Sequence, residues 1–188
     1  MYERVKFKCS CCGNIHEEWP ALAFASPDNY DCLSKNDKKD IGYLNSDFCV
    51  ITHKEQTDRF IRCTLIQKVN DHCEDLHYGL WVSLSEKSYL DYEENFQKES
   101  EEKVYFGWLC NDIAGYEFEE SIPMNVVTRN NGLRPELFPH ESFEHPFVKE
   151  YYNGILKSEA ERRILEMLGN ISKTDNKKWW QVWKLKKR

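Results

Sequence analysis

The chain of 188 residues is long enough for one domain with a hydrophobic core, and its ten Phe, ten Tyr and six Trp exclude a disordered protein. The formal net charge is −6, but residues 173–188 contain seven Lys or Arg and one Asp, so the first 172 residues carry −12. Because nucleic-acid binding needs clustered basic side chains, this acidic body argues against a nucleic-acid partner. It suits a basic protein partner, or serves solubility alone.

The first half of the chain predicts four strands. Apolar residues alternate with Lys over residues 5–9, which is typical of a half-buried strand, and this strand leads into a cysteine-rich turn. The polar residues 26–40 predict a loop with one helical turn. Three further segments are rich in β-branched and aromatic residues and predict strands: 46–51, 59–66 and 78–84. The last two are separated by a short polar turn and predict an antiparallel hairpin.

The second half predicts three helices. The first is capped by Ser85 and runs from Glu86 to about Lys98, with its aromatic residues on one face. The other two are expected at residues 146–152 and 159–168, the former ended by Asn153-Gly154.

Three more strands are expected between these helices. Residues 104–110 are apolar on both faces and predict a central strand. Residues 122–128 and 133–137 contain prolines, which places them toward an edge of the sheet. The fold class is therefore α+β: a mainly antiparallel sheet of about six or seven strands with one central and two C-terminal helices. We expect a single domain over residues 1–172, followed by a basic, Trp-rich tail over 173–188.

Several short motifs occur in order along residues 5–168. They are Cys9-x-x-Cys12-Gly13-x-x-His16-Glu17, Pro27-Asp28-x-Tyr30, Ser46-Asp47-x-Cys49-Val50-Ile51, Phe60-Ile61-Arg62, Gly79-x-Trp81-Val82-Ser83-Leu84-Ser85, Phe106-Gly107-Trp108-Leu109-Cys110-Asn111, Gly132-Leu133-Arg134-Pro135, His145-Pro146 and Gly154-Ile155. With these motifs the chain resembles an uncharacterised bacterial family, catalogued as domain of unknown function 2199. The resemblance implies a small cytosolic bacterial protein and transfers no activity. The extra cysteines and the basic tail depart from the family pattern.

The turn that begins at Cys9 is typical of a zinc knuckle. Two thiolates on one tight turn, Cys9 and Cys12, form half of a tetrahedral zinc site. We expect Cys49 as the third ligand and His16 as the fourth, with Cys110 as a further candidate. The alternatives are a pair of thiols without metal and a redox pair, the latter disfavoured because the motif does not lie between a strand and a helix.

Other polar residues offer weaker candidates. The cluster from His72 to His77 contains two imidazoles and one thiol, but a hairpin turn gathers polar residues anyway. Arg62, Arg134 and His145 could line a pocket, although for Arg62 we favour a cross-strand ion pair. No His-Glu-x-x-His motif, phosphate loop or nucleophile elbow is present in the sequence.

The sequence also predicts the cellular location of the protein and the contacts of its C-terminal tail. Residues 1–6 contain no apolar segment, and no apolar run reaches the roughly 18–20 residues of a transmembrane helix. We therefore expect a cytoplasmic protein, whose eight cysteines are thiols or metal ligands and not a disulfide framework. The tail suits either docking on the acidic body, which we favour, or contact with a membrane surface.

Our leading hypothesis is a non-enzymatic protein-binding module with a structural zinc site. Its sharpest form is an immunity or antitoxin-like protein that masks a basic toxin by electrostatic complementarity. The alternative is a metal- or thiol-dependent enzyme that uses Cys9, Cys12, His16 and Cys49. The sequence does not indicate an oligomeric state.

Overall fold

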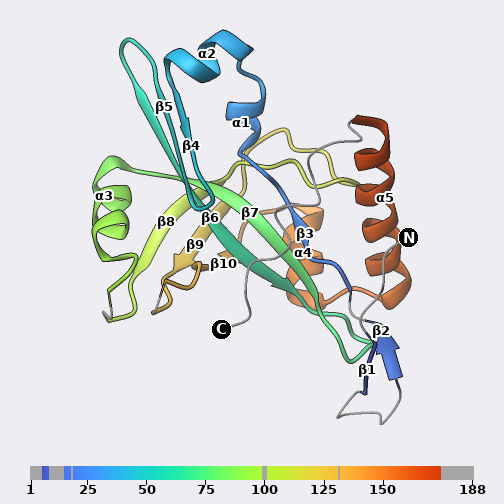
Figure 1. The fold of residues 1–188 in the computed structure, drawn as a ribbon. Coiled ribbons are helices and arrows are strands. Elements are labelled where there is room, and N and C mark those ends of the chain that lie inside the picture. The colour runs from blue at the N-terminus through green and yellow to red at the C-terminus, as the bar shows by residue number, and fades with distance from the viewer. Residues whose placement is uncertain (1–5, 9–14, 18, 99–100, 131, 175–188) are drawn as a thin grey trace.

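A computed structural model of the protein describes residues 6–8, 15–17, 19–98, 101–130 and 132–174 (Figure 1). Within these residues the chain forms an α+β fold. The strands are β1 (Lys6–Lys8), β2 (Ile15–Glu17), β3 (Leu22–Ala23), β4 (Gly42–Leu44), β5 (Phe48–Thr52), β6 (Thr57–Gln67), β7 (Leu76–Leu84), β8 (Val104–Leu109), β9 (Pro123–Val127) and β10 (Glu136–Pro139). The helices are α1 (Asp28–Asp31), α2 (Lys35–Asp40), α3 (Glu86–Asn95), α4 (Pro146–Asn153) and α5 (Lys157–Thr174).

Five strands close into a barrel. The strands β6, β7, β8, β9 and β10 follow one another in antiparallel pairs. The last of them, β10, returns beside the first, β6, in a parallel pairing of Glu136 with Thr64. The predicted hairpin of the third and fourth strands is confirmed as β6 and β7. Among the described residues, the main sheet has eight strands, five of them in the barrel, in place of the six or seven predicted. Strands β1 and β2 form a separate two-stranded hairpin.

The prediction that the two proline-containing strands lie at an edge is wrong. Both β9 and β10 have neighbours on two sides, and the edges of the large sheet are β3 and β4. The prolines are tolerated because Pro123 is the first residue of β9, where a missing backbone N–H disrupts the pairing least, and Pro135 lies just before β10.

Helices cover the barrel from two sides. Figure 1 shows α3 on one side and α4 and α5 on the other. Tyr89 and Tyr92 of α3 pack against Phe48, as their predicted spacing indicates. Phe147 of α4 and Ile164 of α5 enter the main core, together with the inward-facing residues of the barrel strands.

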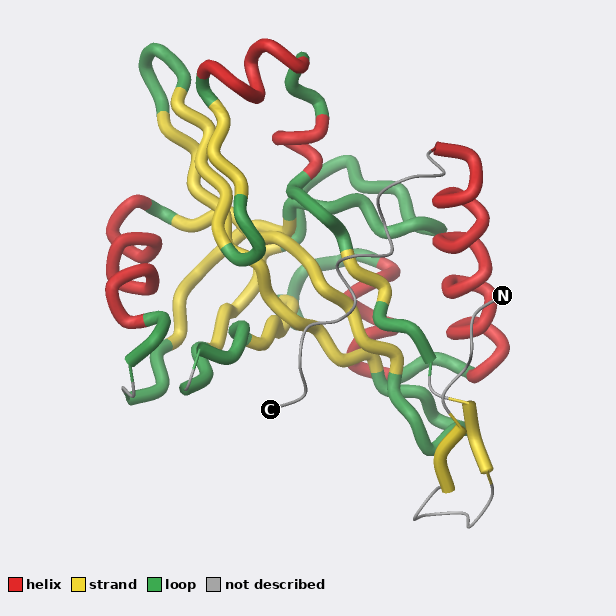
Figure 2. Tube along the Cα trace, in the orientation of Figure 1, coloured by secondary structure: helices red, strands yellow, loops and turns green. Residues whose placement is uncertain are grey.

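An arm of the sheet extends beyond the barrel. Strands β4 and β5 continue from β6, and Figure 2 shows them projecting with the two short helices α1 and α2 beside them. A second core fills the base of this arm, built from Cys49, Ile51, Phe60 and Trp81. Asn111 fixes this core to the barrel, because its side-chain oxygen accepts a hydrogen bond from Trp81 N at 2.8 Å.

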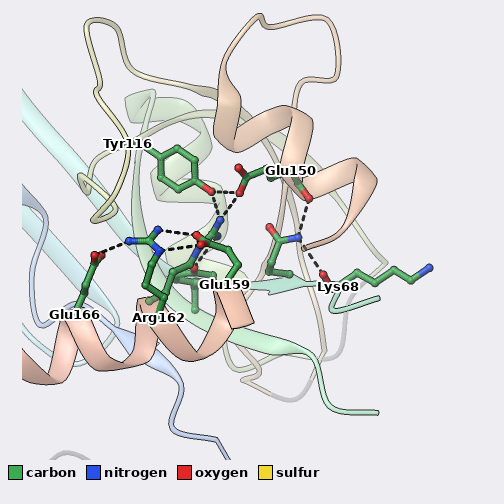
Figure 3. Close-up of polar contacts among 9 residues, drawn as sticks. Lys68, Tyr116, Glu150, Glu159, Arg162 and Glu166 are labelled. Atoms are coloured by element: carbon green, nitrogen blue, oxygen red, sulfur yellow. Dashed lines mark hydrogen bonds and ion pairs between the residues drawn. The ribbon is translucent and has the colours of Figure 1, made fainter. Parts of the chain in front are cut away.

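A buried polar network ties the last two helices together. Arg163 of α5 is 2% exposed and pairs with Glu150 of α4 and, at 2.7 Å, with Glu159. The hydroxyl of Tyr116 meets the same Glu150 carboxylate at 2.6 Å, and Figure 3 shows these groups converging. Every charge in the network has a partner of opposite sign, so we assign the network a structural role: it holds α4 against α5.

Helix α5 passes the predicted domain boundary at residue 172 and ends at Thr174. Residues 175–188, the rest of the predicted tail, lie outside the described residues, so neither docking nor membrane contact of the tail is tested. Among the described residues, no helix is both long and apolar enough to cross a lipid bilayer.

Candidate protein-binding surface

The predicted zinc ligands fall in different parts of the chain. Cys9 and Cys12 lie outside the described residues. His16 lies in β2, where its backbone pairs with Phe7 of β1. Cys49 lies in β5, is fully buried, and packs in the second core. Burial, with smaller contributions from Asp31 and Cys110, raises the pKa of the Cys49 thiol to about 12.

The structure does not bring His16 and Cys49 together. In Figure 1 the β1–β2 hairpin lies at one end of the molecule and β5 at the other. The turn between β6 and β7 lies beside the hairpin instead. Trp19, two residues beyond β2, stacks on His72 of this turn at 4.4 Å, and its backbone N donates to Glu74 Oε1 at 3.1 Å. Within the described ranges no group of three or more His, Cys, Asp or Glu residues has the arrangement of a metal site.

The three other polar candidates have separate roles. Arg134, just before β10, donates to the carboxylate of Asp47, just before β5, at 2.8 Å and forms an ion pair with it. The ion pair expected for Arg62 is absent from the described residues, so that prediction is wrong. His145 caps α4: its Nδ1 accepts from Phe147 N at 3.1 Å, and its Nε2 lies 2.9 Å from Glu117 O. This geometry fits a neutral imidazole with the proton on Nε2.

Burial differs most from the prediction on the outer face of β8, whose side chains are exposed. The strand is central, as predicted, because it pairs with both β7 and β9. Its inward residues Gly107 and Leu109 are buried, but Val104, Phe106 and Trp108 on the other face are 61%, 47% and 45% exposed. Three large apolar side chains on one strand face thus meet solvent, a pattern typical of an interaction surface.

Neighbouring strands extend this face into one surface. The ring of Phe106 meets Trp108 edge-on at 5.1 Å and His140, just beyond β10, at 5.5 Å. In turn, His140 Nε2 lies 3.0 Å from Asn125 Oδ1, and Asn125 is the cross-strand partner of Phe106. We call Val104, Phe106, Trp108, Asn125 and His140 the aromatic face. These contacts hold its rings in a fixed arrangement, which lowers the entropy lost on binding.

A shallow open hollow of about 570 Å³ adjoins the aromatic face. Its lining residues are Asn125, Pro139, His140, Glu141, Ser142 and Tyr152. The hydroxyl of Tyr152 donates to Pro139 O at 2.6 Å, which fixes the wall that α4 contributes. The hollow is too open to exclude water from a reaction, but it can accept a side chain of a partner protein.

The apolar run that forms the aromatic face is evident in the sequence, but it predicts a strand that is buried on both faces. Continuous apolar character over residues 104–110 indicates a strand with two apolar faces, and burial on both faces is the usual reason for it. The sequence pattern does not say whether a layer of this same chain covers the second face. Here none of the described helices does so, and Val104, Phe106 and Trp108 stay exposed.

Fold and surface together define a class: an α+β protein with a five-stranded barrel, a fully paired buried charge network and an exposed aromatic strand face. The chain belongs to the family described as "Uncharacterized protein conserved in bacteria (DUF2199)", which it matches over residues 8–155. This confirms the resemblance found in the motifs. Comparison with curated proteins and with solved structures found no match.

Proposed function

We propose that the protein is a non-enzymatic binding module that masks a basic partner protein, in the manner of an immunity or antitoxin protein. The aromatic face is the proposed contact surface. The observation that carries the proposal is the exposure of Phe106 and Trp108 on a strand that is otherwise fully integrated into the barrel. Aromatic side chains at the centre of an interface supply much of the binding energy.

Charge supports the choice of a basic partner. The first 172 residues carry −12, and Glu141 contributes a carboxylate to the hollow beside the aromatic face. An acidic surface accelerates association with a basic protein and selects against acidic ones. Such a module acts by covering its partner's working surface and needs no catalytic residue.

The rival hypothesis of a thiol-dependent enzyme gains no support from Cys49. A catalytic thiol needs a lowered pKa, whereas burial raises the pKa of Cys49 to about 12 and that of the neighbouring Cys110 to about 11. The part of this hypothesis that concerns Cys9, Cys12 and His16 stays a prediction. A structural zinc ion bound by these three residues likewise stays part of our proposal.

The test compares variants of the aromatic face in partner capture. The protein is immobilised, partners are captured at low salt from a lysate of the encoding organism, and the captured protein is purified and its affinity measured. We expect the double variant Phe106→Ser/Trp108→Ser to lose about tenfold or more in affinity, because it removes the two central aromatic anchors.

Tyr43→Ser provides the matched control. Tyr43 is 54% exposed on β4 of the same sheet, outside the aromatic face, so its loss should leave affinity unchanged. Raising the salt concentration should weaken the complex by shortening the reach of the charges. Recovery of no basic protein at low salt, or equal affinity of the double variant and the wild type, would refute the proposal.

A further inference from the structure

Arg62 is a buried cation that lacks the partners that buried cations usually have. It lies on the outer face of β6, opposite Trp81 of β7, and is only 6% exposed. Its Nε atom is fully buried without a hydrogen-bond partner. The other buried arginine, Arg163, has two carboxylates at ion-pair distance, whereas Arg62 has none among the described residues.

The carboxylate of Asp47, which acts electrostatically on Arg62, is already paired with Arg134. Asp47 pairs with Arg62 through the backbone, since Arg62 N donates to Asp47 O at 2.9 Å. The side chain of Asp47, however, accepts from Arg134 Nε at 2.8 Å. The Asp47 carboxylate is thus paired with Arg134, and the positive charge of Arg62 has no carboxylate at ion-pair distance among the described residues.

Other neighbours do not replace the missing anion. The Trp81 ring lies 6.0 Å from Arg62 Cζ, at the outer limit of a cation–π contact. Burial, reinforced by the charge of Arg134, lowers the pKa of Arg62 to about 10, with Asp47 opposing the shift. Burying an unpaired charge is costly, so proteins place such charges where a counter-ion or ligand completes the pair.

We propose that Arg62, on the outer face of β6 beside Gly79 and Trp81 of β7, binds a small oxyanion. A planar guanidinium presents parallel N–H donors that match the oxygen spacing of a phosphate or carboxylate group. Arg134, which is ion-paired with Asp47, adds a second positive group whose charge acts on Arg62. This site is independent of the proposed function, since none of its residues belongs to the aromatic face.

The experiment follows thermal unfolding in sodium phosphate, sodium acetate and sodium chloride at equal ionic strength. At a phosphate concentration about ten times the dissociation constant, the melting temperature of the wild type should rise by about 4 °C relative to chloride. Acetate reports whether a carboxylate is accepted in place of phosphate. Arg62→Gln should abolish the rise.

Arg59→Gln is the matched control, because Arg59 lies on the same strand and pairs with Glu86 at 2.5 Å. It should retain the full rise. An equal rise in Arg62→Gln, or no rise with either anion in the wild type, overturns the proposal.

A second variant tests the site even if Arg62→Gln does not fold. Asp47→Asn removes the competing carboxylate while keeping the shape of the side chain, so calorimetric titration with phosphate should show tighter binding, by about tenfold. Unchanged or weaker phosphate binding by Asp47→Asn contradicts the site.

Discussion

Glu159 connects the helix α5 surface to the buried network. Its carboxylate accepts hydrogen bonds from Arg162 at 2.7 Å and 2.8 Å and from Arg163 at 2.7 Å. The hydrogen bonds from Arg162 in the first place, and those from Arg163, lower the pKa of Glu159 from 4.5 to about 2. A carboxyl whose pKa is lower in the folded than in the unfolded state stabilises the fold only while it is ionised.

Stability should therefore fall on acidification through a defined window. The contribution of Glu159 is complete above pH 4.5 and is lost as the pH falls from 4.5 toward about 2. In Glu159→Gln this part of the loss should be absent, because Gln does not titrate. Urea unfolding at several pH values between the two limits measures the difference.

Glu161→Gln serves as the control, since Glu161 is half-exposed and forms a long ion pair with Lys157, at 3.7 Å. Its slope of stability against pH should match that of the wild type. Identical slopes for Glu159→Gln and the wild type would show that Glu159 does not titrate in the window.

At the scale of the element, local sequence patterns predict the longer strands and helices but not the short strands. Strand positions over the barrel and the three longer helices were expected from alternation, capping and turn residues, which act between near neighbours. The strands of two or three residues, β2, β3 and β4, were missed because so few residues carry no periodicity. The last strand was displaced, from 133–137 to Glu136–Pro139, since its pairing depends on β6 and β9.

Gly107 is the position in β8 that tolerates a side chain least. A Cβ atom there would lie 2.9 Å from Ser83 O of the adjacent strand and 3.3 Å from Leu84 Cδ2. Because the first contact is with backbone, the strands must separate, and Gly107→Ala should lower the free energy of unfolding by about 1–3 kcal/mol. Chemical denaturation measures this change.

Val104→Ala is the control on the same strand. Its side chain is exposed on the outer face, so the expected loss stays below about 1 kcal/mol. Equal losses for Gly107→Ala and Val104→Ala would mean that β7 and β8 do not approach as closely as the structure shows.

At the scale of the whole molecule, the β1–β2 hairpin lies beside the β6–β7 turn and apart from the arm that contains Cys49 (Figure 1). Strand β2, which contains His16, therefore lies beside the turn and apart from β5. His72 and Cys73 are the imidazole and thiol that the turn offers. The sequence alone favoured Cys49 because it is anchored in a strand, not because of its distance from the hairpin.

Elemental analysis of the purified protein tests this arrangement. We expect one zinc per chain, lost in Cys9→Ser because it removes half of the thiolate pair, and retained in Cys49→Ser because Cys49 is buried in the second core. Cys32→Ser, an exposed thiol on the arm, is the control and should keep the metal. Absence of zinc from the wild type prepared anaerobically would remove the structural zinc site from the proposal.

The sequence by itself determined the α+β class, the family, the acidic body and most of the strands and helices, because these follow from composition and from interactions between neighbours in the chain. Tertiary structure alone decided which surfaces meet. The barrel closes through the parallel pairing of β10 with β6, and the second apolar face of β8 stays uncovered. Asp47 forms its ion pair with Arg134 and not with Arg62. Each of these depends on residues far apart in the sequence, whose pairing no local periodicity specifies.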